Sequence, residues 1–140
     1  MPKVQESIEI KATPSACYKV IWDFAKYPEF VDAVKDIKVR KKKEKTCEVD
    51  FKLDLIKEVS YTIKAKGEPG DFVEWDLVEG QLFKKNWGRW DLEELKKGLT
   101  LATYTVDVEF NMFVPGPIAK MLVGSSLPKT LRSFKERIEK

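Results

Sequence analysis

Histidine is absent from this chain of 140 residues, and cysteine occurs only twice. Without histidine the sequence lacks the commonest general base and the commonest metal ligand, so a Ser-His or Cys-His catalytic device is excluded. The two cysteines, Cys17 and Cys47, fit no short metal-binding or redox spacing. We therefore predict two reduced thiols, no metal site and no cofactor.

Long apolar runs are also missing. No segment approaches the roughly 20 apolar residues that a membrane helix needs, and the polar, alternating N-terminus does not resemble a secretory signal. The net charge of +3 is modest and does not require nucleic acid as a partner. Because 140 residues is close to the commonest size of one domain, we expect a single cytoplasmic domain over residues 1–140.

Alternation of apolar and polar residues is the main pattern in the chain. It predicts seven strands, centred on 3–11, 37–39, 49–55, 59–65, 73–77, 86–92 and 102–110. Short turns join the last six of them, which favours an antiparallel meander with one apolar face.

Two short helices are expected between the first two strands. Thr13 followed by Pro14 is typical of a helix start, and this helix should end near Lys26. A second, very short helix should begin at Tyr27-Pro28, because a proline restricts the preceding residue to extended geometry.

The C-terminal segment 115–140 is expected to cover the apolar face of the sheet. Its second half places four apolar side chains on one helical stripe, at Leu127, Leu131, Phe134 and Ile138. Its first half, 118–123, is apolar almost all round, and Gly124 with Pro128 predicts a kink or two helices. The predicted fold class is α+β, a curved antiparallel sheet wrapped around a long C-terminal helix.

A helix on a strongly curved sheet can leave a cavity, whereas a helix on a flat sheet leaves none. Gly88 lies in mid-strand on the inward face, where it lets the strand bend or a ligand approach. Aromatic walls suit an apolar ligand, although the same rings can fill a solid core, and alternation alone does not decide between the two. The expected lining residues are Tyr27, Phe30, Phe51, Leu53, Tyr61, Ile63, Trp75, Leu77, Asn86, Trp90, Leu92, Tyr104, Val106, Phe110, Ile118, Met121 and Leu122.

Several stretches resemble the START-like, or helix-grip, superfamily (SRPBCC). They are 12–14, 20–24, 27–31, 82–92 and 100–110 followed by the C-terminal helix. The most similar branch is the polyketide cyclase/dehydrase group, which includes the coenzyme Q-binding proteins. The resemblance covers nearly the whole chain and implies a curved seven-stranded sheet, two short helices after the first strand, and a cavity under the last helix. The sequence departs from quinone-binding relatives at 30–34, where those often continue with Pro and Cys.

Members of this superfamily carry lipids, sterols, quinones or plant hormones, and some shape polyketides. We therefore expect binding or transport of an apolar small molecule such as a lipid, an isoprenoid quinone or a polyketide-like compound. One alternative is a cyclase- or dehydrase-like enzyme that uses Tyr61 or Tyr104 as acid or oxyanion donor. Another is a protein-interaction module, like the ribosome-associated toxins that the resemblance includes. It would act through the basic run Arg40 to Lys45 and through 118–123, and the same segments are candidates for a transient membrane contact.

Overall fold

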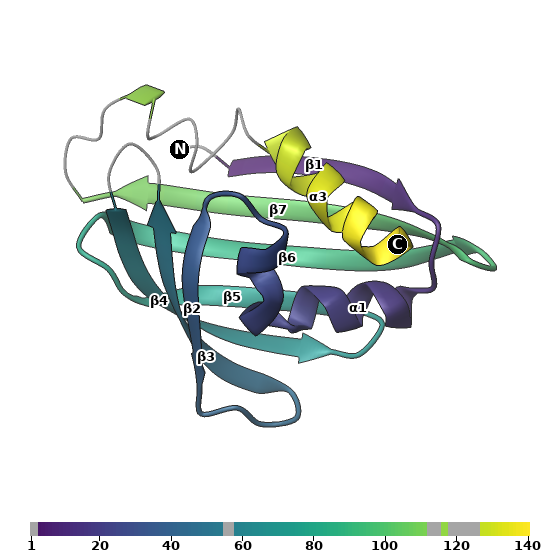
Figure 1. Cartoon of the computed structure of the whole chain (residues 1–140), viewed down its shortest axis with the longest axis horizontal. Helices are drawn as coiled ribbons and strands as arrows, with labels where there is room; N and C mark the ends of the chain where they lie inside the picture. Colours follow the sequence, from purple (N-terminus) through teal and green to yellow (C-terminus); the bar gives the residue numbers. More distant parts are fainter. Residues whose placement is uncertain (1–2, 55–57, 112–115, 118–126) are drawn as a thin grey trace.

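The computed structural model describes residues 3–54, 58–111, 116–117 and 127–140. Its seven strands form one antiparallel sheet in the order β1-β7-β6-β5-β4-β3-β2 (Figure 1). Their bounds are β1 (Lys3–Ile10), β2 (Val34–Arg40), β3 (Thr46–Asp54), β4 (Glu58–Glu68), β5 (Phe72–Glu79), β6 (Phe83–Lys96) and β7 (Leu99–Phe110). The α+β class and the curved antiparallel sheet with seven strands are confirmed.

The first helix begins where the sequence predicts. In α1 (Pro14–Trp22) the side-chain oxygen of Thr13 accepts a hydrogen bond from the Ala16 amide at 3.1 Å, as an N-cap does. The helix ends at Trp22 instead of near Lys26, because Asp23 leaves helical geometry with φ −84° and ψ 68°.

A 3-10 helix, η1 (Phe24–Glu29), follows α1 directly. Tyr27 lies inside this helix, so the expectation of extended backbone before Pro28 is wrong. The Tyr27 side chain is buried, and its hydroxyl donates a hydrogen bond of 2.6 Å to the carbonyl of Ile21. This bond ties η1 to the end of α1, and tertiary packing thereby overrides the local preference of an X-Pro pair.

The C-terminal helix α3 (Leu127–Glu139) contacts β1 and α1, and Figure 1 shows α1, η1 and α3 in front of the same face of the sheet. As predicted, Leu131 and Phe134 point into the core, and Ile138 packs against it. The predicted kink and the apolar stretch 118–123 lie outside the described residues. No helix in the described part of the chain is long and apolar enough to cross a membrane.

The sheet bends because its strands pair over limited lengths. β5 and β6 pair only where residues 72–75 face residues 88–91, so the sheet opens between the second half of β5 and the first half of β6. Register shifts interrupt β4 between Thr62 and Ile63 and β6 between Phe83 and Lys85. Bulges of this kind bend a strand and increase its twist. Phe134 of α3 packs against Trp90 on the inward face of the bent sheet, with ring centroids 5.1 Å apart.

Gly88 makes room for a side chain of the neighbouring strand. It pairs with Trp75 across β5 and β6, and a Cβ at Gly88 would lie 2.7 Å from Cη2 of the Trp75 indole and closer still to Cζ2 and Cε2. The indole therefore lies directly over the Gly88 backbone. The missing side chain makes room for a neighbouring ring, rather than for a ligand.

Candidate functional site

A cavity of about 150 Å³ lies between the inward face of the sheet, η1 and α3. Ten of the residues expected from the sequence line it, namely Tyr27, Phe51, Leu53, Tyr61, Ile63, Trp75, Asn86, Trp90, Tyr104 and Val106. They are brought together because alternate residues of β3, β4, β5, β6 and β7 face the same side.

Four expected residues do not line the cavity. Leu77 and Leu92 belong to the core away from it, and Phe110 stacks on Phe83 at a centroid distance of 5.8 Å. Phe30, which we expected near a mouth together with Tyr27, packs edge-on against Phe134. Leu77, Leu92 and Phe110 are inward by their sequence pattern but are separated from the cavity by another ring or by position along the strand, whereas Phe30 follows η1 and lies on no strand. The remaining three, Ile118, Met121 and Leu122, lie outside the described residues.

Seven lining residues were missed by the sequence reasoning. They are Phe24, Val31, Ala33, Val34, Phe83, Thr130 and Phe134. Most of them come from η1, from the segment before β2 and from α3, where period-two alternation carries no information. Phe83 is different. The inward residues of β6, such as Asn86, have even numbers, and a register shift directly after Phe83 brings this odd-numbered residue to the same side. Only Phe134 had a usable signal, its place on the apolar stripe of the last helix.

Eight of the lining side chains form an unbroken chain of ring contacts, which we call the aromatic belt. In order of contact they are Trp75, Tyr104, Trp90, Phe134, Tyr27, Phe51, Tyr61 and Phe83. The shortest step is 4.8 Å between the centroids of Trp90 and Tyr104, and Phe51 stacks on Tyr61 at 5.1 Å with the planes 5° apart. Pairs at these distances stabilise one another beyond their burial. The wall of the cavity is therefore a connected set of rings.

The belt tyrosines differ in how their hydroxyls are used. The hydroxyl of Tyr27 is bonded to the backbone, whereas those of Tyr61 and Tyr104 have no hydrogen bond to a backbone group among the described residues. Burial raises the pKa of Tyr104 to about 12 and raises that of Tyr61 further, although the side chain of Asn86 lowers the latter. Both side chains are half-buried; Tyr104 lines this cavity, and Tyr61 lines both the cavity and an open groove on β2 to β4.

The chemistry available at this site is narrow. Among the described residues that line the cavity, none is acidic or basic, and the titratable ones are Tyr27, Tyr61 and Tyr104. Because their pKa values are raised, all three hydroxyls stay protonated near neutral pH. A protonated phenol donates a hydrogen bond but does not act as a general base. The arrangement suits recognition of a ligand better than proton abstraction.

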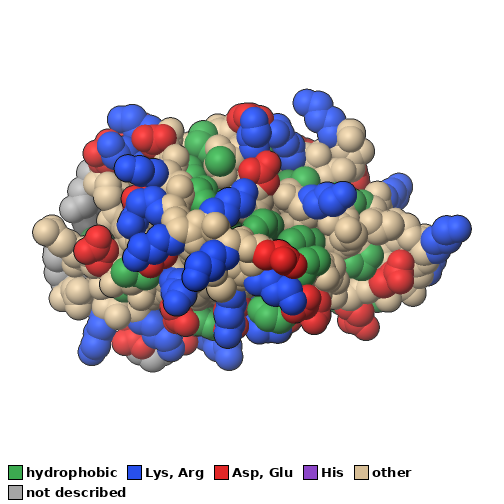
Figure 2. Space-filling model, turned by 90° about the horizontal axis from the view of Figure 1, so that it is seen from below, with side chains coloured by type: hydrophobic (Ala, Val, Ile, Leu, Met, Phe, Trp, Pro, Cys, Tyr) green, Lys and Arg blue, Asp and Glu red, His purple; other side chains and the backbone are tan. Residues whose placement is uncertain are grey.

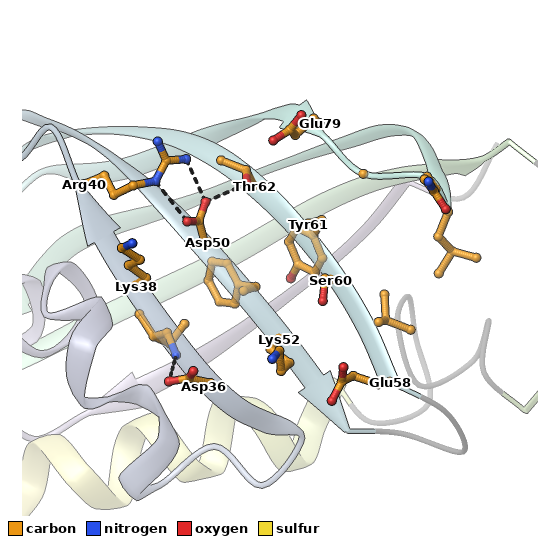
Figure 3. A pocket seen from close by; sticks show the side chains of 16 residues that line it. Asp36, Lys38, Arg40, Asp50, Lys52, Glu58, Ser60, Tyr61, Thr62 and Glu79 are labelled. Atoms are coloured by element: carbon orange, nitrogen blue, oxygen red, sulfur yellow. Dashed lines mark hydrogen bonds and ion pairs between the residues drawn. The ribbon is translucent and has the colours of Figure 1, made fainter.

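A second, open groove of about 1110 Å³ lies on the outer side of β2, β3 and β4 (Figure 3). Arg40 donates two hydrogen bonds to Asp50, of 2.9 and 2.8 Å, and Thr62 donates a third to the same carboxylate at 2.6 Å. The guanidinium holds the pKa of Asp50 below its usual range. These groups fall on the outer parity that the sequence predicts, and they satisfy one another, so the groove shows no free catalytic pair among them.

The family model described as polyketide cyclase/dehydrase and lipid transport matches residues 10–135. Among solved structures, a START superfamily protein from Mycobacterium smegmatis is 20% identical with a TM-score of 0.84, covering 99% of this chain and 98% of that one. A STAR-related lipid transfer protein from Xanthomonas axonopodis is 14% identical with a TM-score of 0.81, covering 99% and 86%. The Zhui aromatase/cyclase from Streptomyces sp. R1128 is 15% identical with a TM-score of 0.72, covering 97% and 85%.

These structural likenesses establish the fold alone. At such identities a shared architecture does not imply a shared activity. No curated protein sequence matches the chain significantly. The site therefore has to be interpreted from its own residues.

Proposed function

Because this chain belongs to the polyketide cyclase/dehydrase and lipid transport family, we propose that it binds or carries an apolar small molecule between its sheet and α3. A lipid, an isoprenoid quinone and a polyketide-like compound are the candidate ligands. The observation that carries the proposal is a cavity walled by the aromatic belt and free of charged side chains among its described lining residues. The names of two structural neighbours, a lipid transfer protein and an aromatase/cyclase, are compatible with ligands of this kind.

The cavity volume limits what fits. Typical small-molecule sites measure roughly 300–1,000 Å³, whereas this one measures about 150 Å³. A dry apolar cavity of roughly that size holds one benzene ring. A compact ligand of this size fits into the cavity, which is partly open, and a longer one places a single ring here and widens the cavity or extends out of it.

Binding of a guest is tested first with the native protein. Native mass spectrometry of protein purified from its host, followed by lipid extraction, should reveal a bound apolar compound. Toluene binding, followed by NMR, should be abolished by Val106→Phe, which places a ring inside the cavity. The same substitution at Val78, an exposed residue on β5, is the control. Absence of any bound compound, together with no toluene binding, would contradict the proposal.

A cyclase- or dehydrase-like activity is the second candidate. It is supported by one feature, the place of Tyr61 and Tyr104 in the cavity wall. If either hydroxyl is an acid or oxyanion donor, its replacement by Phe abolishes turnover of a polyketide-like substrate while binding of that substrate persists. Loss of binding without a separate effect on turnover assigns the hydroxyls to recognition instead.

The end of the β2–β3 hairpin supports a contact with an anionic membrane, from which an apolar ligand is collected. Residues 38–52 contain seven basic and three acidic side chains, whereas the rest of the chain contains 19 and 20. Lys41, Lys42 and Lys43 are exposed at the turn, and Figure 2 shows many Lys and Arg side chains, with Asp and Glu side chains among them, on the face seen from below. Positive charge concentrated at one end favours anionic headgroups.

Vesicles of phosphatidylcholine with and without phosphatidylserine test this contact. Each lysine near an anionic surface contributes about 1 kcal/mol, so Lys42→Glu with Lys43→Glu should weaken serine-dependent vesicle binding by at least about tenfold. The same reversal at Lys96 and Lys97, an exposed basic pair at the β6–β7 turn, is the matched control. Equal losses in the two double variants, or no vesicle binding by the wild type, would contradict a membrane contact at this hairpin. Capture of a protein by the hairpin would point to a protein partner instead.

A further inference from the structure

Three of the polar side chains in the cavity wall are Asn86, Tyr61 and Tyr104, which we call the polar corner. Asn86 on β6 is buried with 7% of its surface exposed, lines the cavity, and has an amide with two donor hydrogens and an acceptor oxygen. Its side chain interacts with that of Tyr61, and no hydrogen bond from it to a backbone group is present among the described residues. Most of its hydrogen-bonding capacity therefore faces the cavity.

A buried amide with unused hydrogen-bonding groups destabilises a fold, because the hydrogen bonds to water that it loses on burial are not replaced. Leu or Val at position 86 would fill the same space without that cost. The tyrosines of the polar corner point the same way, since both line the cavity and neither hydroxyl has a hydrogen bond to a backbone group among the described residues. By contrast, Tyr27, in the same belt, has its hydroxyl bonded to the Ile21 carbonyl. The polar corner thus presents donors and an acceptor that the described protein leaves available.

The lining residues and the volume of the cavity also limit the charge and the size of the ligand. No acidic or basic side chain among the described lining residues is present to neutralise an ion, and burying an unpaired charge is strongly unfavourable. The guest is therefore neutral. A volume of about 150 Å³ admits one six-membered ring, and the aromatic belt supplies ring faces on which it packs.

We propose that the cavity selects a neutral six-membered ring that carries a hydroxyl or carbonyl oxygen, held by a hydrogen bond to Asn86 and the adjoining tyrosine hydroxyls. This inference rests on the proposed ligand binding and adds the chemical class that the site prefers. A hydroxyl on the ring donates to the amide oxygen of Asn86, whereas a carbonyl accepts from its NH₂ group or from a tyrosine hydroxyl.

Phenol and toluene are the probes, because they have nearly the same shape and differ by one hydroxyl. Dissociation constants measured by calorimetry or NMR should show phenol bound about threefold to tenfold more tightly than toluene, as expected for one net hydrogen bond. Asn86→Leu should remove this preference by weakening phenol and leaving toluene equal or stronger. Tyr61→Phe and Tyr104→Phe should reduce it separately, which keeps the test decisive if Asn86→Leu does not fold.

Tyr18→Phe is the matched control, since the Tyr18 hydroxyl is buried without a partner among the described residues and lies outside the cavity lining. It should leave the preference for phenol unchanged. If wild type binds both probes equally, or if all three variants at the polar corner keep the wild-type ratio, the inference is wrong while ligand binding itself stands. If neither probe binds, the proposed function fails as well.

Discussion

Gly88→Ala is the sharpest test of how the cavity is built. The new methyl group would lie 2.7 Å from Cη2 of Trp75 and nearer to two other ring atoms, whereas carbon atoms in contact are normally about 3.5–4.0 Å apart. The backbone at Gly88 does not have a positive φ, so alanine is accepted there without backbone strain. The indole must therefore move away by about 1.5 Å. It is expected to move into the cavity, because the Trp75 ring lines that free space.

The size of the effect follows from the ring. A Trp side chain buries roughly 200 Å², and about a quarter of this area is the ring face that moves into the cavity. When that face shifts by about 1.5 Å, it takes up roughly 75 Å³ of the cavity. This is half of the cavity volume of about 150 Å³, and the remainder is too small for a six-membered ring. Overpacking costs about 1–3 kcal/mol, and a less flexible unfolded chain offsets about 0.4–1 kcal/mol of it. We expect a net loss of about 1–2 kcal/mol in the free energy of unfolding and at least tenfold weaker toluene binding.

Urea denaturation and calorimetry measure the two effects, and Trp75→Leu provides the second arm of a double-mutant cycle. With a leucine at 75, the alanine at 88 has room, so its cost in unfolding free energy should largely disappear. Coupling between contacting residues of this kind is typically 0.5–3 kcal/mol. If Gly88→Ala is equally costly with and without Trp75, or if it leaves toluene affinity at the wild-type value, the indole does not occupy the space over Gly88 and the reasoning is refuted.

Three further predictions concern hydrogen bonds. Tyr27→Phe should lower the free energy of unfolding by about 1–3 kcal/mol, because it leaves the buried carbonyl of Ile21 without its partner; an unchanged urea midpoint would refute this. Tyr18→Phe should raise the free energy of unfolding by about 1 kcal/mol, because it removes a buried hydroxyl without a partner among the described residues, and a loss of stability would contradict it. The backbone N–H of Lys11 lowers the pKa of Glu139, so this carboxylate stabilises the fold above the usual glutamate pKa and stops doing so as pH falls through its lowered value. The difference in Tm between wild type and Glu139→Gln should therefore be present at pH 7 and shrink as the pH falls below the ordinary glutamate pKa of about 4.3; a difference that stays constant in acid would exclude ionisation of Glu139 as its cause.

The strands and their inward faces were predictable from alternation alone. Phe51, Tyr61, Trp75, Trp90 and Tyr104 all lie where a period of two places them, because sterics force successive side chains to opposite faces. The end of the first helix was not predictable, since no local pattern shows that Asp23 leaves helical geometry or that the Tyr27 hydroxyl bonds to the carbonyl of Ile21.

The cavity itself needed the structure. Alternation shows which side is buried, but a void depends on whether helix side chains such as Phe134 and Thr130 fill the bend. The inward position of Phe83 results from a bulge, and the alternation of apolar and polar residues does not show where a bulge occurs. The bonded hydroxyl of Tyr27 and the available one of Tyr104 are likewise indistinguishable in the sequence, because the difference lies in their neighbours.

The aromatic belt takes its rings from seven elements, β3 to β7, η1 and α3. Only the completely folded chain assembles them, so a guest has affinity for the native state and none for the denatured one. By thermodynamic linkage, a compound present at a hundred times its dissociation constant adds about 2.7 kcal/mol to the unfolding free energy. Preparations that differ in occupancy will therefore melt at different temperatures, and the melting curve itself reports how much cargo the protein holds.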